Sequence, residues 1–313
     1  MALPWKVRAL LRTQSALQKA RLFPSNDRLA QMPAAKRMAM GPAKGLVGEL
    51  APVATEDRVV TTRDGASIRV RVYRSAEPTD QPLLYVHGGG FVFGGIPACD
   101  HMCRRLAHET GAVVVSVEYR LAPEHPFPVP LHDTLDAGQW LAEHAEELGV
   151  DVRKLVVGGD SAGGNLAAAF AIAYRDQGTP LAAQLLIYPV VDLALSLPGV
   201  QEYRGLGLRK KDLHGCADGY LGDHDPTDPL ASPWYADVTG VAPAMVVTVH
   251  HDVLHYEGVA YADKLRDAGV PVDHVDIEDH AHGSLSLPKL YRGIDELYGK
   301  MTRFVRQAAV PAS

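Results

Sequence analysis

The sequence predicts an α/β fold in which helices cover both faces of a doubly wound, mostly parallel sheet. Short apolar runs alternate with helical stretches along most of the chain, which is the order that such a sheet requires. The chain has 313 residues, of which 47% are hydrophobic and 22% are charged. This length and composition are sufficient for a large core that needs no disulfide or structural metal.

The expected elements follow in chain order. An antiparallel pair comes first, at residues 59–62 and 68–73, with Asp64 and Gly65 in the turn between them. The next runs are mainly apolar, as in strands that are buried on both faces of a parallel sheet. They are residues 82–86, 112–117, 155–157, 185–188, 244–249 and 272–277. Helical patterns follow near residues 99–110, 131–148, 163–177, 257–268 and 289–308.

Two segments do not follow this alternation, residues 1–50 and the Gly- and Pro-punctuated residues 192–240. Open α/β sheets bind substrates at the carboxyl ends of their strands. We therefore predict that both segments form a cap over that edge. The core of the fold then consists of residues 51–191 and 241–313.

The composition excludes several classes of protein. A net charge of −6 is not that of a nucleic-acid-binding protein. Cys99, Cys103 and Cys216 are odd in number, so free thiols in a reducing compartment are expected instead of a disulfide scaffold. No apolar run reaches the roughly 18 residues of a membrane span, and the N-terminus does not have a secretory signal pattern. We expect a cytoplasmic monomer or homodimer.

The basic residues concentrate near the N-terminus. Up to residue 45, nine basic residues accompany a single acid, Asp27; the basic residues are Lys6, Arg8, Arg12, Lys19, Arg21, Arg28, Lys36, Arg37 and Lys44. An interrupted apolar stripe, with Val7, Leu10, Leu11 and Leu17, accompanies them. We interpret this pattern as a cap helix with a solvated basic face, and peripheral contact with anionic lipid is the alternative.

The most informative motif is G-x-S-x-G at residues 159–163, between a predicted strand and a predicted helix. A serine at the tip of a sharp strand–helix turn needs glycines two residues before and after it, because side chains there would obstruct the turn. The Ser161 hydroxyl then projects above the sheet, close to the positive end of the helix dipole. By itself the motif also fits a tight turn without catalysis.

A second motif, His87-Gly88-Gly89-Gly90, directly follows the predicted strand at residues 82–86. Consecutive glycines bring backbone N–H groups close to a ligand and direct two of them at one point. An oxyanion of an acyl-transfer intermediate would be held at such a point. A flexible glycine loop is the alternative, but it would need neither the histidine nor the strand before it.

With these two motifs and the run Tyr119-Arg-Leu-Ala-Pro-Glu124, the sequence resembles the hormone-sensitive-lipase-like family of α/β-hydrolases from about residue 82 to residue 283. The resemblance implies the α/β-hydrolase fold, with a mostly parallel eight-stranded sheet, helices on both faces and a helical cap. It also implies that Ser161 is the nucleophile and that the N–H groups of Gly88, Gly89 and Ala162 form the oxyanion hole. His87 and residues 119–124 are then structural.

The family places the acid and the base after the serine, in that order. Asp252, after the strand at residues 244–249, matches the acid of the family pattern. His282 matches the base, and Ser284 replaces the family's aromatic residue, which predicts a wider pocket. His280, two residues before His282, is the main rival base.

Together these features predict a serine carboxylesterase that hydrolyses short- to medium-chain acyl esters through an acyl-enzyme, with no cofactor and no metal site. Two alternatives are an arylamide or lactone hydrolase on the same triad, and a non-catalytic receptor of the same fold. A third is a metal hydrolase, since several side chains could look like ligands. They are His250, His251, Asp252, His255, His280 and His282.

Overall fold

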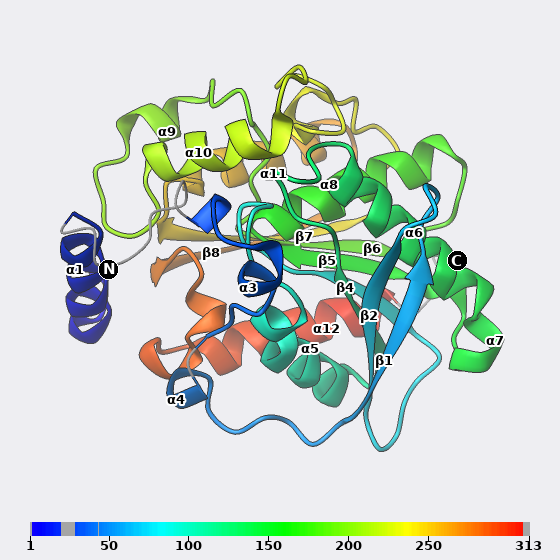
Figure 1. Cartoon of the computed structure of the whole chain (residues 1–313). Helices are drawn as coiled ribbons and strands as arrows, with labels where there is room; N and C mark the ends of the chain where they lie inside the picture. Colours follow the sequence, from blue (N-terminus) through cyan, green and yellow to red (C-terminus); the bar gives the residue numbers. More distant parts are fainter. Residues whose placement is uncertain (1, 20–28, 43, 309–313) are drawn as a thin grey trace.

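The computed structural model describes residues 2–19, 29–42 and 44–308 and is built on one eight-stranded sheet (Figure 1). The strand order is β1-β2-β4-β3-β5-β6-β7-β8. The strands are β1 (Ala54–Thr61), β2 (Ser67–Arg74), β3 (Pro82–Val86), β4 (Val113–Glu118), β5 (Val156–Asp160), β6 (Ala183–Ile187), β7 (Ala244–His251) and β8 (Val272–Ala281). β2 is antiparallel to β1 and to β4, and all other neighbours are parallel. The predicted fold class is confirmed.

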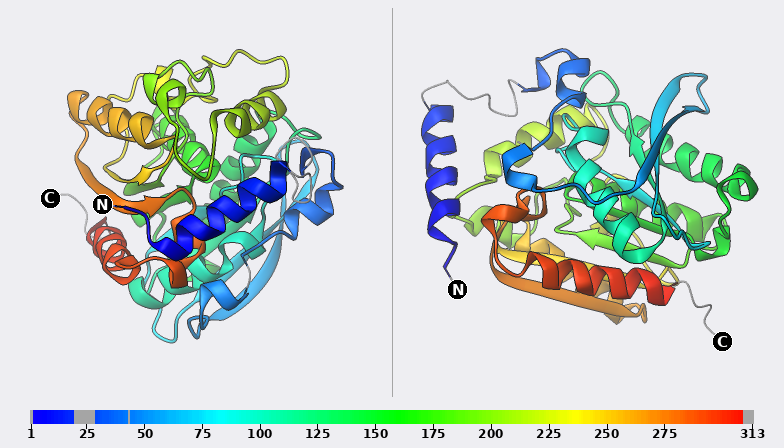
Figure 2. Two further views of the ribbon diagram at one scale, coloured as in Figure 1. Left: turned by 90° about the vertical axis from the view of Figure 1, so that its left-hand side faces the viewer. Right: turned by 90° about the horizontal axis from the view of Figure 1, so that it is seen from below.

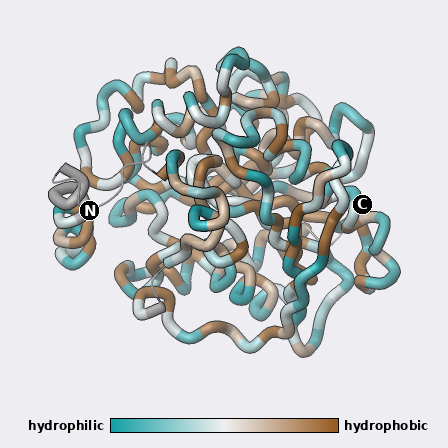
Figure 3. Tube along the Cα trace, in the orientation of Figure 1, coloured by the Kyte–Doolittle hydropathy of each residue, from teal (hydrophilic) through white to brown (hydrophobic). Residues whose placement is uncertain are grey.

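Helices cover both faces of the sheet, so the central strands are buried on both sides (Figure 2). In β3, Leu83 and Tyr85 belong to one hydrophobic cluster and Leu84 and Val86 to the other, as strand alternation requires. The helices are α1 (Trp5–Lys19), α3 (Ala34–Met38), α4 (Lys44–Val47), α5 (Ile96–Thr110), α6 (Val129–Glu143), α7 (Ala145–Leu148), α8 (Ala162–Asp176), α9 (Pro198–Glu202), α10 (Lys210–Leu221), α11 (His255–Asp267) and α12 (Ile294–Ala308). α5 and α12 cover one face, and α6, α8 and α11 cover the other. Figure 3 colours each residue along the chain by its hydropathy; residues of the central strands belong to the two hydrophobic clusters.

Each expected strand overlaps an observed one, but the burial predicted for the last strand is wrong. β8 lies at the edge of the sheet, and its side chains are mostly exposed or half-buried. An edge strand has a neighbour on one side only, and Asp273 and Asp276 already give this segment a polar character. With these two polar residues, the run at residues 272–277 is less apolar than a strand that is buried on both faces.

The N-terminal segment packs against the core through a few side chains. Leu3 and Val7 of this segment are buried, whereas Lys6, Arg8 and Arg12 are exposed, as expected for a helix with a solvated basic face. The side chain of Leu17, and Arg21, Asp27 and Arg28, lie outside the described residues. None of the described helices combines the length and the apolar character that crossing a membrane demands.

Arg37 of α3 connects the N-terminal segment to the loops that follow β3 and β4. Its buried guanidinium donates hydrogen bonds to the carbonyl oxygens of Val92 and Ala122 and forms an ion pair with Glu124. The carbonyl of Arg37 also accepts a hydrogen bond from Gly94, at 3.0 Å. One side chain thus satisfies buried backbone groups of two loops that are distant in sequence.

We predict that Arg37→Leu lowers the free energy of unfolding by about 3 kcal/mol, because it leaves buried carbonyl oxygens without a donor. Urea denaturation followed by circular dichroism measures this change. Arg8→Leu, on the exposed face of α1, is the matched control and should change the free energy by less than about 0.5 kcal/mol. Equal effects of the two substitutions would contradict the role assigned to Arg37.

Candidate active site

Ser161 occupies the sharp turn between β5 and α8. Its backbone has φ 57° and ψ −119°, a strained conformation that non-glycine residues rarely adopt and that is typical of functional sites. The turn is held by a hydrogen bond from the Ser161 N–H to the carbonyl of Ile187, at 2.8 Å. The neighbouring strand β6, which ends at Ile187, therefore helps to hold the strained backbone conformation of Ser161.

The glycines of this turn are required because it lies against the end of β3. A Cβ atom on Gly163 would lie 2.0 Å from the carbonyl oxygen of Val86, and one on Gly159 would lie 2.6 Å from the same oxygen. Both distances are far below van der Waals contact. The motif glycines thus permit the close approach that brings Ser161 next to the glycine loop after β3.

The structure brings Ser161, His282 and Asp252 together. The Ser161 hydroxyl lies 2.9 Å from Nε2 of His282, and Nδ1 of His282 lies 2.7 Å from Oδ2 of Asp252. His282 follows β8, and Asp252 follows β7, so adjacent parallel strands deliver both side chains to one edge of the sheet. Asp252 is buried, and its Oδ1 accepts a hydrogen bond from the N–H of Leu254 at 3.0 Å.

Charge around His282 favours its protonated form. Burial lowers the pKa of His282, but the charge and hydrogen bond of Asp252, with the charge of Asp160, outweigh this effect and raise the pKa above its ordinary value of 6.5. With His282 neutral, Nδ1 donates to Asp252 and the lone pair of Nε2 accepts the Ser161 proton. This arrangement can remove a proton from the hydroxyl and stabilise the imidazolium that results.

The glycine loop is fixed by the residues around it. His87 is fully buried and stacks on Tyr119, with ring centroids 4.2 Å apart. Its Nδ1 donates to the carbonyl of Gly88 at 2.8 Å, and the Tyr119 hydroxyl donates to the carbonyl of His87 at 3.0 Å. Burial lowers the pKa of His87 to about 4, so the ring is neutral. These contacts are those of a structural histidine, as the sequence suggested.

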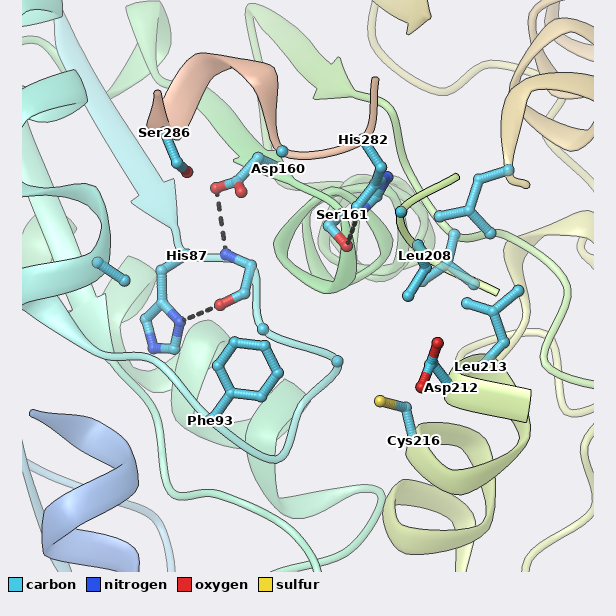
Figure 4. A pocket seen from close by; sticks show the side chains of 18 of the residues that line it. His87, Phe93, Asp160, Ser161, Leu208, Asp212, Leu213, Cys216, His282 and Ser286 are labelled. Carbon is cyan, nitrogen blue, oxygen red and sulfur yellow. Dashed lines mark hydrogen bonds between the residues drawn. The ribbon is translucent and has the colours of Figure 1, made fainter. Parts of the chain in front are cut away.

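The first glycine of the loop differs from its expected role. The N–H of Gly88 donates to Oδ1 of Asp160 at 3.1 Å (Figure 4). The hydroxyl of Tyr85 donates to the same oxygen at 3.0 Å. Burial raises the pKa of Asp160, and these two hydrogen bonds oppose the rise. The prediction that Gly88 holds an oxyanion is therefore not supported by this geometry, since its N–H already has a partner.

Asp160 was not among the candidate residues predicted from the sequence, although it lies inside the serine motif. Gly90, the next glycine of the loop, was not selected either, and it lines the same pocket as Gly89 and Ser161. The motif itself could have indicated Asp160, because a carboxylate beside the serine is buried at the end of a fully buried strand. A buried carboxylate of this kind must find hydrogen-bond donors nearby.

A pocket of about 480 Å³ opens over Ser161 and His282. Residues from the N-terminal segment and from the segment after β6 contribute to its walls, together with the glycine loop (Figure 4). The apolar side chains of the wall are Leu10, Leu11, Met40, Phe91, Phe93, Ala98, Val190, Leu193, Leu195, Leu208, Leu213, Leu254 and Leu287. The volume and the mainly apolar lining are typical of a site for a small organic molecule.

The remaining candidates from the sequence lie elsewhere. His280 is buried and its Nε2 contacts the carbonyl of Arg292 at 2.8 Å; it is in β8, whereas His282 lies beyond the end of that strand. Ser284 is fully buried and is not among the residues that line the described pocket. His250 and His255 contact Asp276 and belong to a separate cluster.

A family model described as alpha/beta hydrolase fold matches residues 83–286, most of the chain. The chain belongs to this α/β-hydrolase family. Among curated relatives, this hydrolase is 40% identical over 257 residues to ethyl acetate hydrolase of Pseudomonas putida, covering 78% of this chain and 80% of the relative. It is 36% identical over 265 residues to carboxylesterase NlhH of Mycobacterium tuberculosis, covering 81% and 82%. The resemblance to the hormone-sensitive-lipase-like family is confirmed.

Solved structures agree with this assignment of the hydrolase. A hyperthermophilic esterase from Pyrobaculum calidifontis superposes with a TM-score of 0.82 at 35% identity, over 99% of this chain and 100% of that chain. An ester hydrolase from the metagenome of Lake Arreo, in complex with a bipyridine phosphonate derivative, superposes with a TM-score of 0.84 at 36% identity, over 98% and 99%.

We predict that His282 of this hydrolase titrates above pH 6.5 and that Asp252→Asn lowers its pKa, because the substitution removes the negative charge that favours the imidazolium. NMR titration of the imidazole resonances measures both values. His108→Gln, on the exposed side of α5, serves to assign a resonance that should be insensitive to Asp252. An unchanged His282 pKa in Asp252→Asn would show that the carboxylate does not control this imidazole.

Proposed function

We propose that this α/β-hydrolase acts as a serine carboxylesterase through Ser161, His282 and Asp252. The protein is a carboxylic ester hydrolase, a class that its family and its named relatives support. The observation that carries the assignment of these three residues is the unbroken line of hydrogen bonds Ser161–His282–Asp252 at the base of an apolar pocket. Each group has the partner that nucleophilic catalysis by a hydroxyl requires.

In the first half-reaction the Ser161 oxygen attacks the ester carbonyl carbon while Nε2 of His282 accepts the hydroxyl proton. The tetrahedral intermediate then collapses as His282 returns this proton to the alcohol, which leaves. Asp252 keeps the proton of the neutral ring on Nδ1 and stabilises the imidazolium by its charge. In the second half-reaction Nε2 of His282 accepts a proton from water as the water oxygen attacks the acyl carbon. His282 then returns this proton to the Ser161 oxygen as the bond to the acyl group breaks and the acid is released.

The oxyanion of each intermediate needs preorganised donors, and each can contribute roughly 3–4 kcal/mol to the transition state. We assign this role to the N–H groups of Gly89 and Ala162, and to that of Gly90 in place of Gly88. The hydrogen bond between Gly88 and Asp160 supports this change, because it occupies the N–H of Gly88, and Gly90 lines the same pocket. Asp160 is thus a positioning residue for the oxyanion hole.

The pocket supports small acyl esters as substrates. Its volume of about 480 Å³ is suited to a short- or medium-chain acyl group with a small alcohol, and its apolar walls favour hydrocarbon over charged chains. We propose that residues 1–50 and 192–240 act as the cap, since Leu11 and Leu213 come from these two segments and line the pocket. The presence of a complete triad disfavours a receptor that binds without turnover, and an amide or lactone remains a candidate for a secondary substrate.

We also propose a compartment, a surface contact and an oligomeric state. Cys99, Cys103 and Cys216 are buried and form no disulfide, which supports a reducing compartment such as the cytoplasm. The exposed Trp5 beside basic residues of α1 supports peripheral contact with anionic lipid. A monomer or a homodimer is the expected oligomeric state.

Ser161→Ala should reduce the kcat for p-nitrophenyl butyrate by at least about 10⁴-fold, because it removes the hydroxyl that is hydrogen-bonded to His282. The wild-type protein should also incorporate one phosphonate group from a p-nitrophenyl phosphonate, and the variant should incorporate none, as measured by intact-protein mass spectrometry. Circular dichroism of the variant controls for folding. Full activity in folded Ser161→Ala would refute the assignment.

The acyl-chain preference should follow the size of the pocket. We expect kcat/KM for p-nitrophenyl esters to fall by on the order of tenfold or more between the butyrate and the palmitate, because the longer chain exceeds the apolar volume. A matched anilide and a lactone, assayed in parallel, test the alternative substrates. A preference for palmitate or for the anilide would overturn the proposed substrate class while leaving the role of Ser161 intact.

A further inference from the structure

A second group of polar side chains lies at the open edge of the sheet, outside the residues that line the pocket. It consists of His250 at the end of β7, His255 at the start of α11, and Asp276 in β8. The three residues lie on three different elements. Folding brings their ligand atoms within 4.8 Å of one another. The proposed esterase mechanism uses none of them.

The two imidazoles converge on the same carboxylate. Nε2 of His250 lies 2.7 Å from Oδ2 of Asp276, and Nε2 of His255 lies 3.0 Å from Oδ1. The two rings lie 4.5 Å apart, centroid to centroid. A neutral imidazole can carry its proton on Nδ1 instead of Nε2. In that tautomer the Nε2 lone pairs of both rings and the Asp276 carboxylate face the same point, and neither ring has lost a proton.

The carboxylate is oriented by a neighbour that does not belong to the three. The hydroxyl of Thr248, directly opposite Asp276 in the β7–β8 ladder, donates to Oδ1 of Asp276 at 2.7 Å. The same hydroxyl lies 2.9 Å from Nε2 of His274. Hydrogen bonds of this kind to a ligating carboxylate are typical of metal sites, where they fix the orientation of the ligand.

We propose that His250, His255 and Asp276 bind a divalent transition-metal ion of the Zn²⁺ class at the edge of the sheet. Nε2 of each histidine and one oxygen of Asp276 supply three ligands, and water fills the remaining positions. Two imidazole nitrogens select zinc, nickel or copper over magnesium and calcium, which prefer oxygen ligands. The side chains of His250, His255 and Asp276 are 42%, 27% and 34% exposed, so a hydrated ion reaches the site from solvent.

The ion in this site is structural and not catalytic. It joins the end of β7, the start of α11 and β8, and the loop that carries Asp252 lies between the first two of these elements. The ion therefore restrains the loop that carries Asp252, and it does not contact the substrate. Because the ion binds only where the three elements are assembled, it stabilises the folded state by mass action.

The test uses chelator-treated full-length protein and Zn²⁺ alone, with binding measured by isothermal titration calorimetry and stability by the thermal midpoint. We expect one ion per chain and a rise in the midpoint. Asp276→Asn should weaken binding by at least about tenfold, and Thr248→Val, which removes only the orienting hydroxyl, by about tenfold. His255→Gln should abolish the rise in the midpoint. His108→Gln, an exposed histidine on α5, is the matched control and should bind as the wild type does.

His282→Gln separates this site from the catalytic histidine. Unchanged Zn²⁺ binding in this variant, with binding lost in His255→Gln, is the expected pattern. The proposal is overturned if binding is lost in His282→Gln instead, since the ion then occupies the triad. It is also overturned if the wild type shows no binding, or if the His250, His255 and Asp276 variants bind as tightly as the wild type. The metal-free midpoint of each variant shows that it folds.

Discussion

The contact between the serine turn and the end of β3 is the constraint on which the site depends. Gly163 and Gly159 lie so close to the carbonyl of Val86 that neither can carry a side chain. Because β3 and β5 are parallel neighbours, the turn after one strand and the glycine loop after the other meet at the same edge. One packing contact thus places Ser161 next to the backbone donors of the loop. This placement does not depend on hydrogen bonds between Ser161 and the loop.

Hydrogen bonds to two carboxylates then fix the groups around this contact. Asp160 holds the glycine loop through Gly88, and Asp252 holds His282. Both carboxylates are buried, so both need the donors that they orient. The same two charges raise the pKa of His282, which links the positioning of the imidazole to its basicity.

Much of this site could be predicted from the sequence because its parts are local. The five residues 159–163 are enough to recognise Ser161, and His282 follows a segment whose sequence pattern predicts a strand. The partner of Gly88 could not be predicted in the same way, because the side chain of Asp160 turns back beneath the loop only in the folded chain. The exposure of β8 depends on strand order, which no local pattern contains. The meeting of Asp276 with two histidines likewise results from the pairing of β7 with β8.

The walls of the pocket and the catalytic groups come from different parts of the chain. Leu11, Leu208 and Leu213 lie in segments that contribute no strand to the sheet, whereas Ser161 lies where a strand meets a helix of the core. Substitutions in the walls can therefore change which acyl group fits while the strained turn and its glycine contacts stay intact. An evolving lineage could acquire new ester specificities one wall residue at a time, at little risk to catalysis.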